Sequence, residues 1–333
     1  MKRVPALLFP LLLLAASAMA QAQAPPSGAA APKPAAAKAD GDYVGSDTCI
    51  TCHDDQNQRF KHTVMGRIFA KPRNSVEARG CEACHGPGKA HVEAGGGKDS
   101  IPVRFAKDSR NTAEEQNSAC LQCHNKGNRL FWRGSQHESR GLKCVDCHEV
   151  MQTPAPGVFA ETRFTSALSD VKQLKKTQPE LCLQCHQMRR AQLQRSSHMP
   201  FREGKVTCTS CHNPHGTPNP KLLLQSTLNE NCYSCHAERR GPFLWEHPPV
   251  MENCGNCHEP HGSTNPQLLK VRPPRLCQQC HVNSGHPGNS WGVYAPDGTN
   301  PAGLATRVLN RGCTNCHAQM HGSNHPSGML FTR

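Results

Sequence analysis

The sequence is poor in the residues that build an ordinary hydrophobic core. Of its 333 residues, 5% are aromatic and 36% are hydrophobic, and Gly and Pro number 27 each. The mean hydropathy of −0.63 agrees with this composition. A chain of this length with so few large apolar side chains is a poor candidate for a conventional globular core. Something other than the polypeptide must therefore supply most of the buried apolar surface.

Long apolar runs are missing beyond the N-terminus. The chain starts with positive residues, an apolar run at positions 4–16 and small residues before a cleavage site after Ala20, with a second candidate after Ala24. This is the pattern of a secretory signal peptide, which we assign to residues 1–20. Residues 21–42 are rich in Ala and Pro, and we expect a flexible tether there. Because no later run reaches 18 apolar residues, the mature chain is not expected to cross a bilayer by itself.

No cysteine stands outside one short motif. The 20 cysteines form ten copies of CxxCH. Two cysteines at this spacing can each form a thioether with one vinyl group of a porphyrin, and the following His then lies under the iron. A zinc ribbon or a disulfide framework would not place a His after every second cysteine. The sequence therefore predicts ten covalently attached haems c.

The predicted attachment residues are Cys49, Cys52, Cys81, Cys84, Cys120, Cys123, Cys144, Cys147, Cys182, Cys185, Cys208, Cys211, Cys232, Cys235, Cys254, Cys257, Cys277, Cys280, Cys313 and Cys316. The predicted proximal iron ligands are His53, His85, His124, His148, His186, His212, His236, His258, His281 and His317. No residue is predicted to be catalytic.

Ten further histidines match the number of sixth ligands that ten bis-histidine haems need. They are His62, His91, His137, His198, His215, His247, His261, His286, His321 and His325. One lies between the two members of each successive motif pair, and another follows the second member in four of the five pairs. The fourth motif has no such follower, so at least one sixth ligand must come from a distant repeat. His325 and Met151 are the alternatives for the fourth iron. Ligation within a pair and ligation across pairs both stay open.

Pro and Gly punctuate the segments between motifs, so long helices are not expected. Short helices should carry the motifs, with starts at Asp47 or Thr48, at Pro179 and Glu180, and at Asn229 and Glu230. Strand signals are few. We predict a mainly α, loop-rich multihaem cytochrome c fold in which short helices and loops wrap a linear array of ten haems.

The formal charge of +13 does not indicate a nucleic-acid partner. Each ferric bis-histidine haem adds about −1, because its two propionates outweigh the single charge of the iron porphyrin. Ten such groups would lower the net charge to about +3. A basic patch with interleaved aromatic residues is also missing from the sequence, and we therefore expect no nucleic-acid binding.

These residues resemble the decahaem cytochromes of the MtrA type, with the relatives MtoA, PioA and DmsE. The likeness spans residues 43–333 and rests on the ten motifs, on the CxxCHxPHG blocks from Cys208 and Cys254, and on CQQCHVNSGHPG from Cys277. The resemblance implies two pentahaem halves, here residues 43–200 and 201–333. It also implies a periplasmic protein associated with the outer membrane through a β-barrel partner, an outer-surface multihaem cytochrome beyond the barrel, and periplasmic or inner-membrane cytochromes as electron-transfer partners.

The expected function is therefore electron conduction across the outer membrane within a barrel-containing complex. It would serve extracellular electron transfer, either reduction of a metal or another external acceptor or oxidation of Fe(II). A soluble periplasmic shuttle is the alternative. A multihaem reductase with one open haem is less favoured, because every motif ends in His and the chain has enough histidines to saturate every iron. The sequence does not contain the direction of electron flow.

Overall fold

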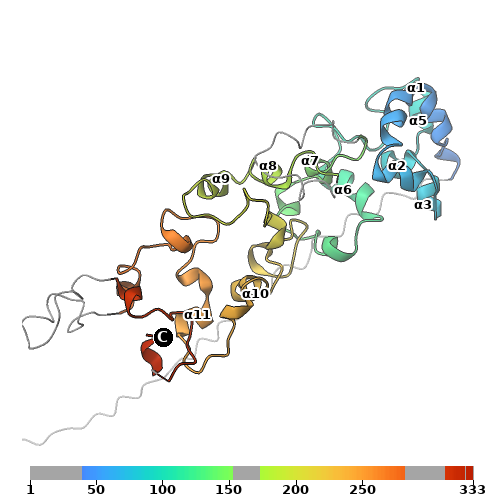
Figure 1. The fold of residues 1–333 in the computed structure, drawn as a ribbon. Helices are drawn as coiled ribbons and strands as arrows, with labels where there is room; N and C mark the ends of the chain where they lie inside the picture. The colour runs from blue at the N-terminus through green and yellow to red at the C-terminus, as the bar shows by residue number, and fades with distance from the viewer. Residues whose placement is uncertain (1–39, 153–172, 282–311, 327, 333) are drawn as a thin grey trace, which may run out of the picture. The chain divides into compact units, whose positions relative to one another are not determined.

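The computed structural model describes residues 40–152, 173–281, 312–326 and 328–332. These residues form short helices joined by loops, and no extended strand occurs among them (Figure 1). The α-helices are α1 Ser46–Phe60, α2 Val64–Phe69, α3 Ser75–Ala78, α4 Glu82–His85, α5 Lys89–Glu93, α6 Ala113–Leu121, α7 Cys144–Cys147, α8 Gln178–Cys182, α9 Gln187–Leu193, α10 Leu228–Tyr233 and α11 Pro248–Glu252. The mainly α, loop-rich fold predicted from the sequence is confirmed.

Helices carry several motifs, but their starts differ slightly from the predicted ones. Thr177 is the residue before α8 and Thr227 is the residue before α10. Each of the two helices therefore begins one residue before its predicted start. The Thr227 hydroxyl accepts the Glu230 N–H, which satisfies one of the donors exposed at a helix start. Helix α1 follows Gly45, whose side chain can form no cap. The predicted start residues therefore lie inside the first turns.

Four motifs occupy single 3₁₀ turns instead of α-helices: Cys208–Ser210, Cys254–Asn256, Cys277–Gln279 and Cys313–Asn315. The backbone enters the turns at 208, 254 and 313 from the extended residues Thr207, Asn253 and Gly312. After the turns at 208 and 254 the chain pairs with a returning segment. The remaining 3₁₀ turns are Asp40–Asp42, Gly127–Arg129, Glu138–Arg140, Pro220–Leu222, Ala237–Arg239, Pro266–Leu268 and Gly328–Leu330.

Three even-numbered motifs are closed by the same antiparallel pairing, which we call the motif hairpin (residues 147–149 with 173–175, 211–213 with 222–224, and 257–259 with 268–270). An isolated antiparallel bridge joins the motif His to a Leu in each: His148 to Leu174, His212 to Leu223 and His258 to Leu269. The next residue donates its N–H to the carbonyl of a residue with left-handed backbone: Glu149 to Gln173, Asn213 to Leu222 and Glu259 to Leu268. The repeat seen in the sequence is thus a repeat of backbone structure.

Buried polar side chains hold the two motifs of a pair together. The Asn229 carboxamide donates to the carbonyls of Val250 and Met251 and accepts the N–H of Cys254. Asn117 does the same for the pair of the third and fourth motifs, with Leu142 as acceptor and Cys144 as donor. Both asparagines lie three residues before the odd-numbered motif of their pair. We call this arrangement the pair clamp. Its amides replace the apolar contacts that would join helices in an ordinary protein.

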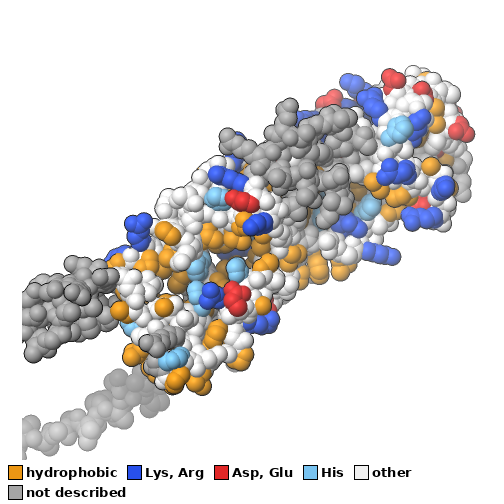
Figure 2. Space-filling view, viewed as in Figure 1, with side chains coloured by type: hydrophobic (Ala, Val, Ile, Leu, Met, Phe, Trp, Pro, Cys, Tyr) orange, Lys and Arg blue, Asp and Glu red, His pale blue; other side chains and the backbone are white. Residues whose placement is uncertain are grey.

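The polypeptide buries very little apolar surface. Among the described residues, the buried hydrophobic side chains are Ala83, Trp132, Leu183, Leu193 and Leu223. Several other large apolar side chains are exposed, with Met188 at 72% and Leu244 at 67%. Histidine and hydrophobic side chains lie next to one another in the hollowed part of the face shown in Figure 2. The surfaces that these side chains present are the ones that bound porphyrins would cover.

Residues 40–333 form one unit by their contacts. Hydrogen bonds cross residue 200, for example from Ser197 to Ser263 and from Asn213 to Asn128. The division into two pentahaem halves near that residue stays a prediction. No helix in the described ranges has the length and hydropathy needed to span a bilayer. The predicted signal peptide and most of the tether lie outside the described residues.

Candidate haem-binding sites

Six motif histidines each face a histidine from elsewhere in the chain at nearly the same separation. Ring centres lie 6.0–6.2 Å apart in the pairs His53 and His91, His137 and His186, His148 and His215, His212 and His261, His247 and His281, and His258 and His321. In five pairs the ring planes are within 20° of parallel, and between His137 and His186 the angle is 61°.

This separation fits one iron between two imidazoles. A histidine nitrogen binds a metal at about 2 Å and lies about 1 Å from the centre of its ring, which places two axial imidazoles about 6 Å apart. Direct packing of parallel rings would bring them closer. The residues present therefore fit haem, and we infer that each of these six pairs would hold one haem iron.

Backbone carbonyls fix the orientation of several of these rings. The Nδ1 atoms of His212 and His258 lie 2.8 Å from the carbonyls of Lys221 and Gln267, and that of His85 lies 2.9 Å from the carbonyl of Val103. An Nδ1–H donated to a carbonyl selects the tautomer with its lone pair on Nε2. Nε2 is then the atom available to an iron. The motif hairpin thus does more than close the backbone, because it orients the proximal ligand.

Burial favours the neutral imidazole, the form that metal ligation requires, at several of the histidines in these sites. It is the largest cause of the lowered pKa of His85, and it also lowers the pKa values of His186 and His247. The pKa of His261 is lowered mainly by burial, and the neighbouring Arg189 guanidinium lowers it further. A neutral imidazole at physiological pH keeps a nitrogen lone pair that can bind a metal.

The ring opposite His148 belongs to His215, which follows the sixth motif. His261, after the eighth motif, faces His212 of the sixth, and His321, after the tenth, faces His258 of the eighth. In these three cases the histidine after an even-numbered motif faces the proximal histidine two motifs earlier, whereas His91, after the second motif, faces His53 of the first. For the fourth iron, the residue that the structure places opposite His148 is His215. It is not His325 or Met151, which the sequence left as alternatives.

Histidines between the members of a pair follow a similar rule. His137, between the third and fourth motifs, faces His186 of the fifth, and His247, between the seventh and eighth, faces His281 of the ninth. By the same step His62 would serve His124, and His198 would serve His236. In the described part of the chain no imidazole stands opposite His124 or His236 at the 6 Å spacing, so these two assignments stay predictions. His286 lies outside the described residues.

The attachment cysteines of consecutive motifs lie near one another along the whole chain. Within each pair the first cysteines are neighbours: Cys49 and Cys81, Cys120 and Cys144, Cys182 and Cys208, Cys232 and Cys254, and Cys277 and Cys313. Between pairs, the second cysteines are neighbours: Cys84 and Cys123, Cys147 and Cys185, Cys211 and Cys235, and Cys257 and Cys280. The fold therefore arranges its attachment points in sequence order from the first motif to the tenth. None of the 20 cysteines forms a disulfide.

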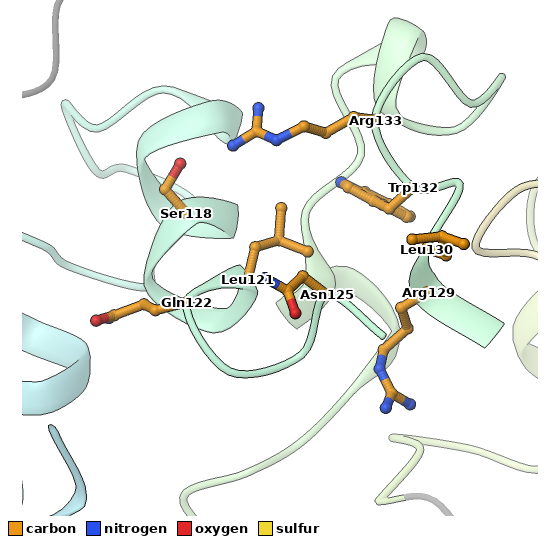
Figure 3. Close-up of a pocket in the computed structure, with 8 residues that line it drawn as sticks. All are labelled: Ser118, Leu121, Gln122, Asn125, Arg129, Leu130, Trp132 and Arg133. Carbon is orange, nitrogen blue, oxygen red and sulfur yellow. The ribbon is translucent and has the colours of Figure 1, made fainter. Parts of the chain in front are cut away.

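A cavity of about 300 Å³ lies beside the third motif (Figure 3). Leu121 and Leu130 line it with apolar surface, and Arg129 and Arg133 add positive charge on either side. The indole N–H of Trp132, also in the lining, is buried without a hydrogen-bond partner. Apolar walls with cations and an unpaired donor suit a porphyrin that carries carboxylates.

Comparisons with known proteins agree with these sites. The chain matches the doubled CXXCH motif family over residues 137–191, 198–241 and 247–286, and an NrfB-like c-type cytochrome family over residues 81–158. It is 43% identical over 300 residues to the multihaem cytochrome MtrA of Shewanella baltica, which covers 89% of this chain and 84% of that protein. The chain belongs to the MtrA family of multihaem cytochromes. The resemblance inferred from the motifs is confirmed, and so is covalently bound haem c.

As an MtrA-family cytochrome, the protein takes part in electron transfer. Bound haem supplies the electron carrier, because its iron alternates between the ferric and ferrous states. The chain supplies attachment, paired imidazoles and a fixed order of sites. Sequence reasoning found the motifs and the additional histidines, but it did not find the pair clamp. Only the position of Asn117 and Asn229, three residues before a motif, could have marked them.

Proposed function

We propose that this MtrA-family cytochrome carries electrons across the outer membrane within a complex that contains a β-barrel protein. The observation that carries the proposal is the unbroken order of neighbouring attachment cysteines from the first motif to the tenth. Haems held in that order pass electrons from neighbour to neighbour and link one end of the chain to the other. The predicted export signal supports a periplasmic location of the mature chain, in the compartment that borders the inner face of that membrane.

Partners at both ends follow from such an arrangement. We propose a periplasmic or inner-membrane cytochrome at one end and an outer-surface multihaem cytochrome at the other. A row of ten haems would be longer than the roughly 30 Å hydrocarbon core of a bilayer. A barrel would shield the haem-bearing chain from lipid, because loops with open backbone groups are not tolerated in hydrocarbon.

The test is transfer across a sealed membrane. The tagged holoprotein would be purified from outer membranes, identified together with any barrel protein, and reconstituted into liposomes that enclose a reduced viologen dye. We expect external ferric citrate to oxidise the enclosed dye when the chain and barrel are both present. A chain released by osmotic shock without a barrel, and liposomes in which the dye stays reduced, would support the periplasmic shuttle instead.

We also propose that the protein is an electron carrier and not an enzyme. Six motif histidines face a second imidazole at the spacing of a six-coordinate iron, which leaves those irons no position for substrate. The ferrous holoprotein should bind CO slowly or not at all. Rapid binding of one CO per chain would instead favour a reductase with an open haem.

A further inference from the structure

The second motif has a described proximal histidine but no imidazole facing it. The Nδ1 atom of His85 is held by the Val103 carbonyl, which directs its Nε2 toward the iron. Its ring contact is with Phe105, at 5.4 Å and nearly perpendicular. Among the described residues no histidine ring lies at the 6 Å spacing. The second iron therefore needs its sixth ligand from another source.

The regular spacing of facing histidines along the chain points to the hairpin of the fourth motif as the source of the sixth ligand. His215, His261 and His321 follow the sixth, eighth and tenth motifs, and each faces the motif histidine two motifs earlier. One further step back along the chain, the residue that follows the fourth motif should face His85. No histidine follows the fourth motif.

The backbone after the fourth motif nevertheless matches that of its later copies. The bridge of His148 to Leu174 corresponds to the bridges of His212 and His258. The returning segment donates an N–H to the carbonyl of the second motif cysteine in all three hairpins, with N to O distances of 2.9–3.0 Å: Lys175 to Cys147, Leu224 to Cys211 and Lys270 to Cys257. The same geometry therefore determines where the third residue after the motif is placed.

That third residue is Met151, and its local bonding is that of a ligand histidine. Its N–H donates to Oε1 of Glu149, two residues earlier, at 3.2 Å. The N–H of His215 donates to Oδ1 of Asn213 at 3.1 Å, and that of His261 to Oε1 of Glu259 at 3.4 Å. Met151 thus occupies the backbone position that presents an imidazole in the later hairpins, and it is exposed, as a residue facing a haem would be.

We propose that the Met151 sulfur is the sixth ligand of the second haem iron. A thioether is a usual axial ligand of c-type haem, and it raises the reduction potential relative to a second histidine. The second haem would then have histidine and methionine ligands among haems with two histidine ligands. Because its reduction potential would be the highest, it would be the first haem to accept an electron. This replaces the expectation that all ten irons are bis-histidine. It concerns haem ligation alone, and it holds whichever membrane setting the protein has.

Two histidines could compete for this iron, and the structure disfavours one of them. His325 directly follows Asn324, whose side chain accepts the N–H of Leu244, so it belongs with the segment after the seventh motif. His62 lies within the first pair, but the rule for histidines inside pairs assigns it to the third iron. A bis-histidine second haem with His62 as ligand is the outcome that would overturn the proposal.

The ferric holoprotein itself provides the first test. Methionine ligation gives a far-red charge-transfer band that bis-histidine haems lack, and we expect this band at the intensity of one haem in ten. Met151→Ala should abolish the band and leave one haem high-spin. Met151→His should abolish it while all haems stay low-spin, and should remove the highest of the reduction potentials. Met188→Ala is the control, because Met188 is 72% exposed in α9 and far along the chain. No band in the wild type, or a band that survives Met151→Ala, would refute the assignment.

Two further variants identify the iron. His215→Ala should leave the far-red band unchanged and make one haem high-spin, because His215 faces His148 of the fourth motif. If Met151 served the fourth iron instead, all haems would stay low-spin in that variant. The double variant Cys81→Ala, Cys84→Ala lacks the second haem and should lose the band with it. A nine-haem protein that keeps the band would show that Met151 binds another iron.

Discussion

The first motif pair and the later pairs close their haem sites in different ways. His91, on α5 just after the second motif, faces His53 of its own pair, so this site is complete between Cys49 and His91. In the later pairs the facing histidine comes from a neighbouring pair, as His261 does for His212. The first haem site is thus closed within its own pair, while the described sites of the later pairs each join two pairs.

The difference has consequences for stability. A site made within one pair depends on short-range contacts, and it can open without disturbing its neighbours. An interlocked site joins two repeats, so its loss loosens both, as expected for an array stabilised by nearest-neighbour interfaces. The hydrogen bonds between Ser197 and Ser263 and between Trp245 and Ser323 belong to these interfaces. Variants at matched positions in the two regions can therefore separate local effects from shared ones.

The largest effect should come from removal of a facing histidine. His261→Ala is expected to convert one haem of ten to high-spin without loss of covalent haem, because the cysteines still hold it. His91→Ala should do the same at the other end of the chain. Magnetic circular dichroism counts the high-spin haems, and the mass of the intact chain counts the attached ones. Added imidazole should restore the low-spin spectrum in both variants.

The two variants should differ in how far the damage spreads. Amide hydrogen exchange in His261→Ala should rise in the segments around residues 192–197 and 208–224, which belong to neighbouring repeats. In His91→Ala it should rise only within the first pair. Equal spread in both would show that the repeats do not interlock, and an unchanged spectrum would remove His261 from the ligands.

The next largest effect is expected at the close approach of two repeats. Gly262 has a φ of +131°, and a Cβ there would overlap the backbone carbonyl of Gln192. Gly262→Ala should lower the free energy of unfolding by about 2–4 kcal/mol, because both strain and a backbone clash are introduced. Gly141 is the matched control, since its φ is +72° but a Cβ there meets nothing within 4 Å.

Gly141→Ala should cost about 1–2 kcal/mol from the left-handed backbone alone. The shift between the guanidinium unfolding midpoints of the two variants then measures the contact between repeats. Equal midpoints would mean that Gln192 moves aside freely.

The motifs and the histidines could be predicted because each is a local pattern. CxxCH fixes the attachment of a haem within five residues, whatever the rest of the chain does. Which histidine faces which iron could not be predicted, because the step of two motifs from His215 back to His148 arises from the interlocking of hairpins.

The pair clamp could not be predicted for a different reason. Asn117 and Asn229 look like ordinary polar helix residues, and only the burial of their side chains reveals their role. With haem as the apolar core, the polypeptide is left with polar contacts between its own segments, so its structural residues are amides and hydroxyls. Hydrophobic periodicity, the main signal of secondary structure, carries little information in such a chain.

A smaller effect should follow from loss of the pair clamp. Asn229→Ala removes three hydrogen bonds and leaves the partly buried N–H of Cys254 without its acceptor, so we expect a loss of about 2–3 kcal/mol in the free energy of unfolding. Ser46→Ala, at the matching position of the first pair, removes one hydrogen bond to Cys81 and should cost about 1 kcal/mol. Far-UV circular dichroism in guanidinium measures both. Equal costs would contradict the clamp as the main link within the later pair.

The smallest effect is expected at a helix start. Thr227→Ala leaves the Glu230 N–H without the hydroxyl that accepts it, and loss of such a cap costs about 1 kcal/mol. The first pair has no counterpart, because α1 begins after Gly45, and Thr51→Ala inside α1 should change the unfolding midpoint little. Since α10 leads directly into the seventh motif, exchange of its amides should rise in Thr227→Ala while the haem spectrum stays unchanged. A spectral change would show that the cap also orients the haem ligand, and that the later pairs depend on their helix starts in a way that the first pair does not.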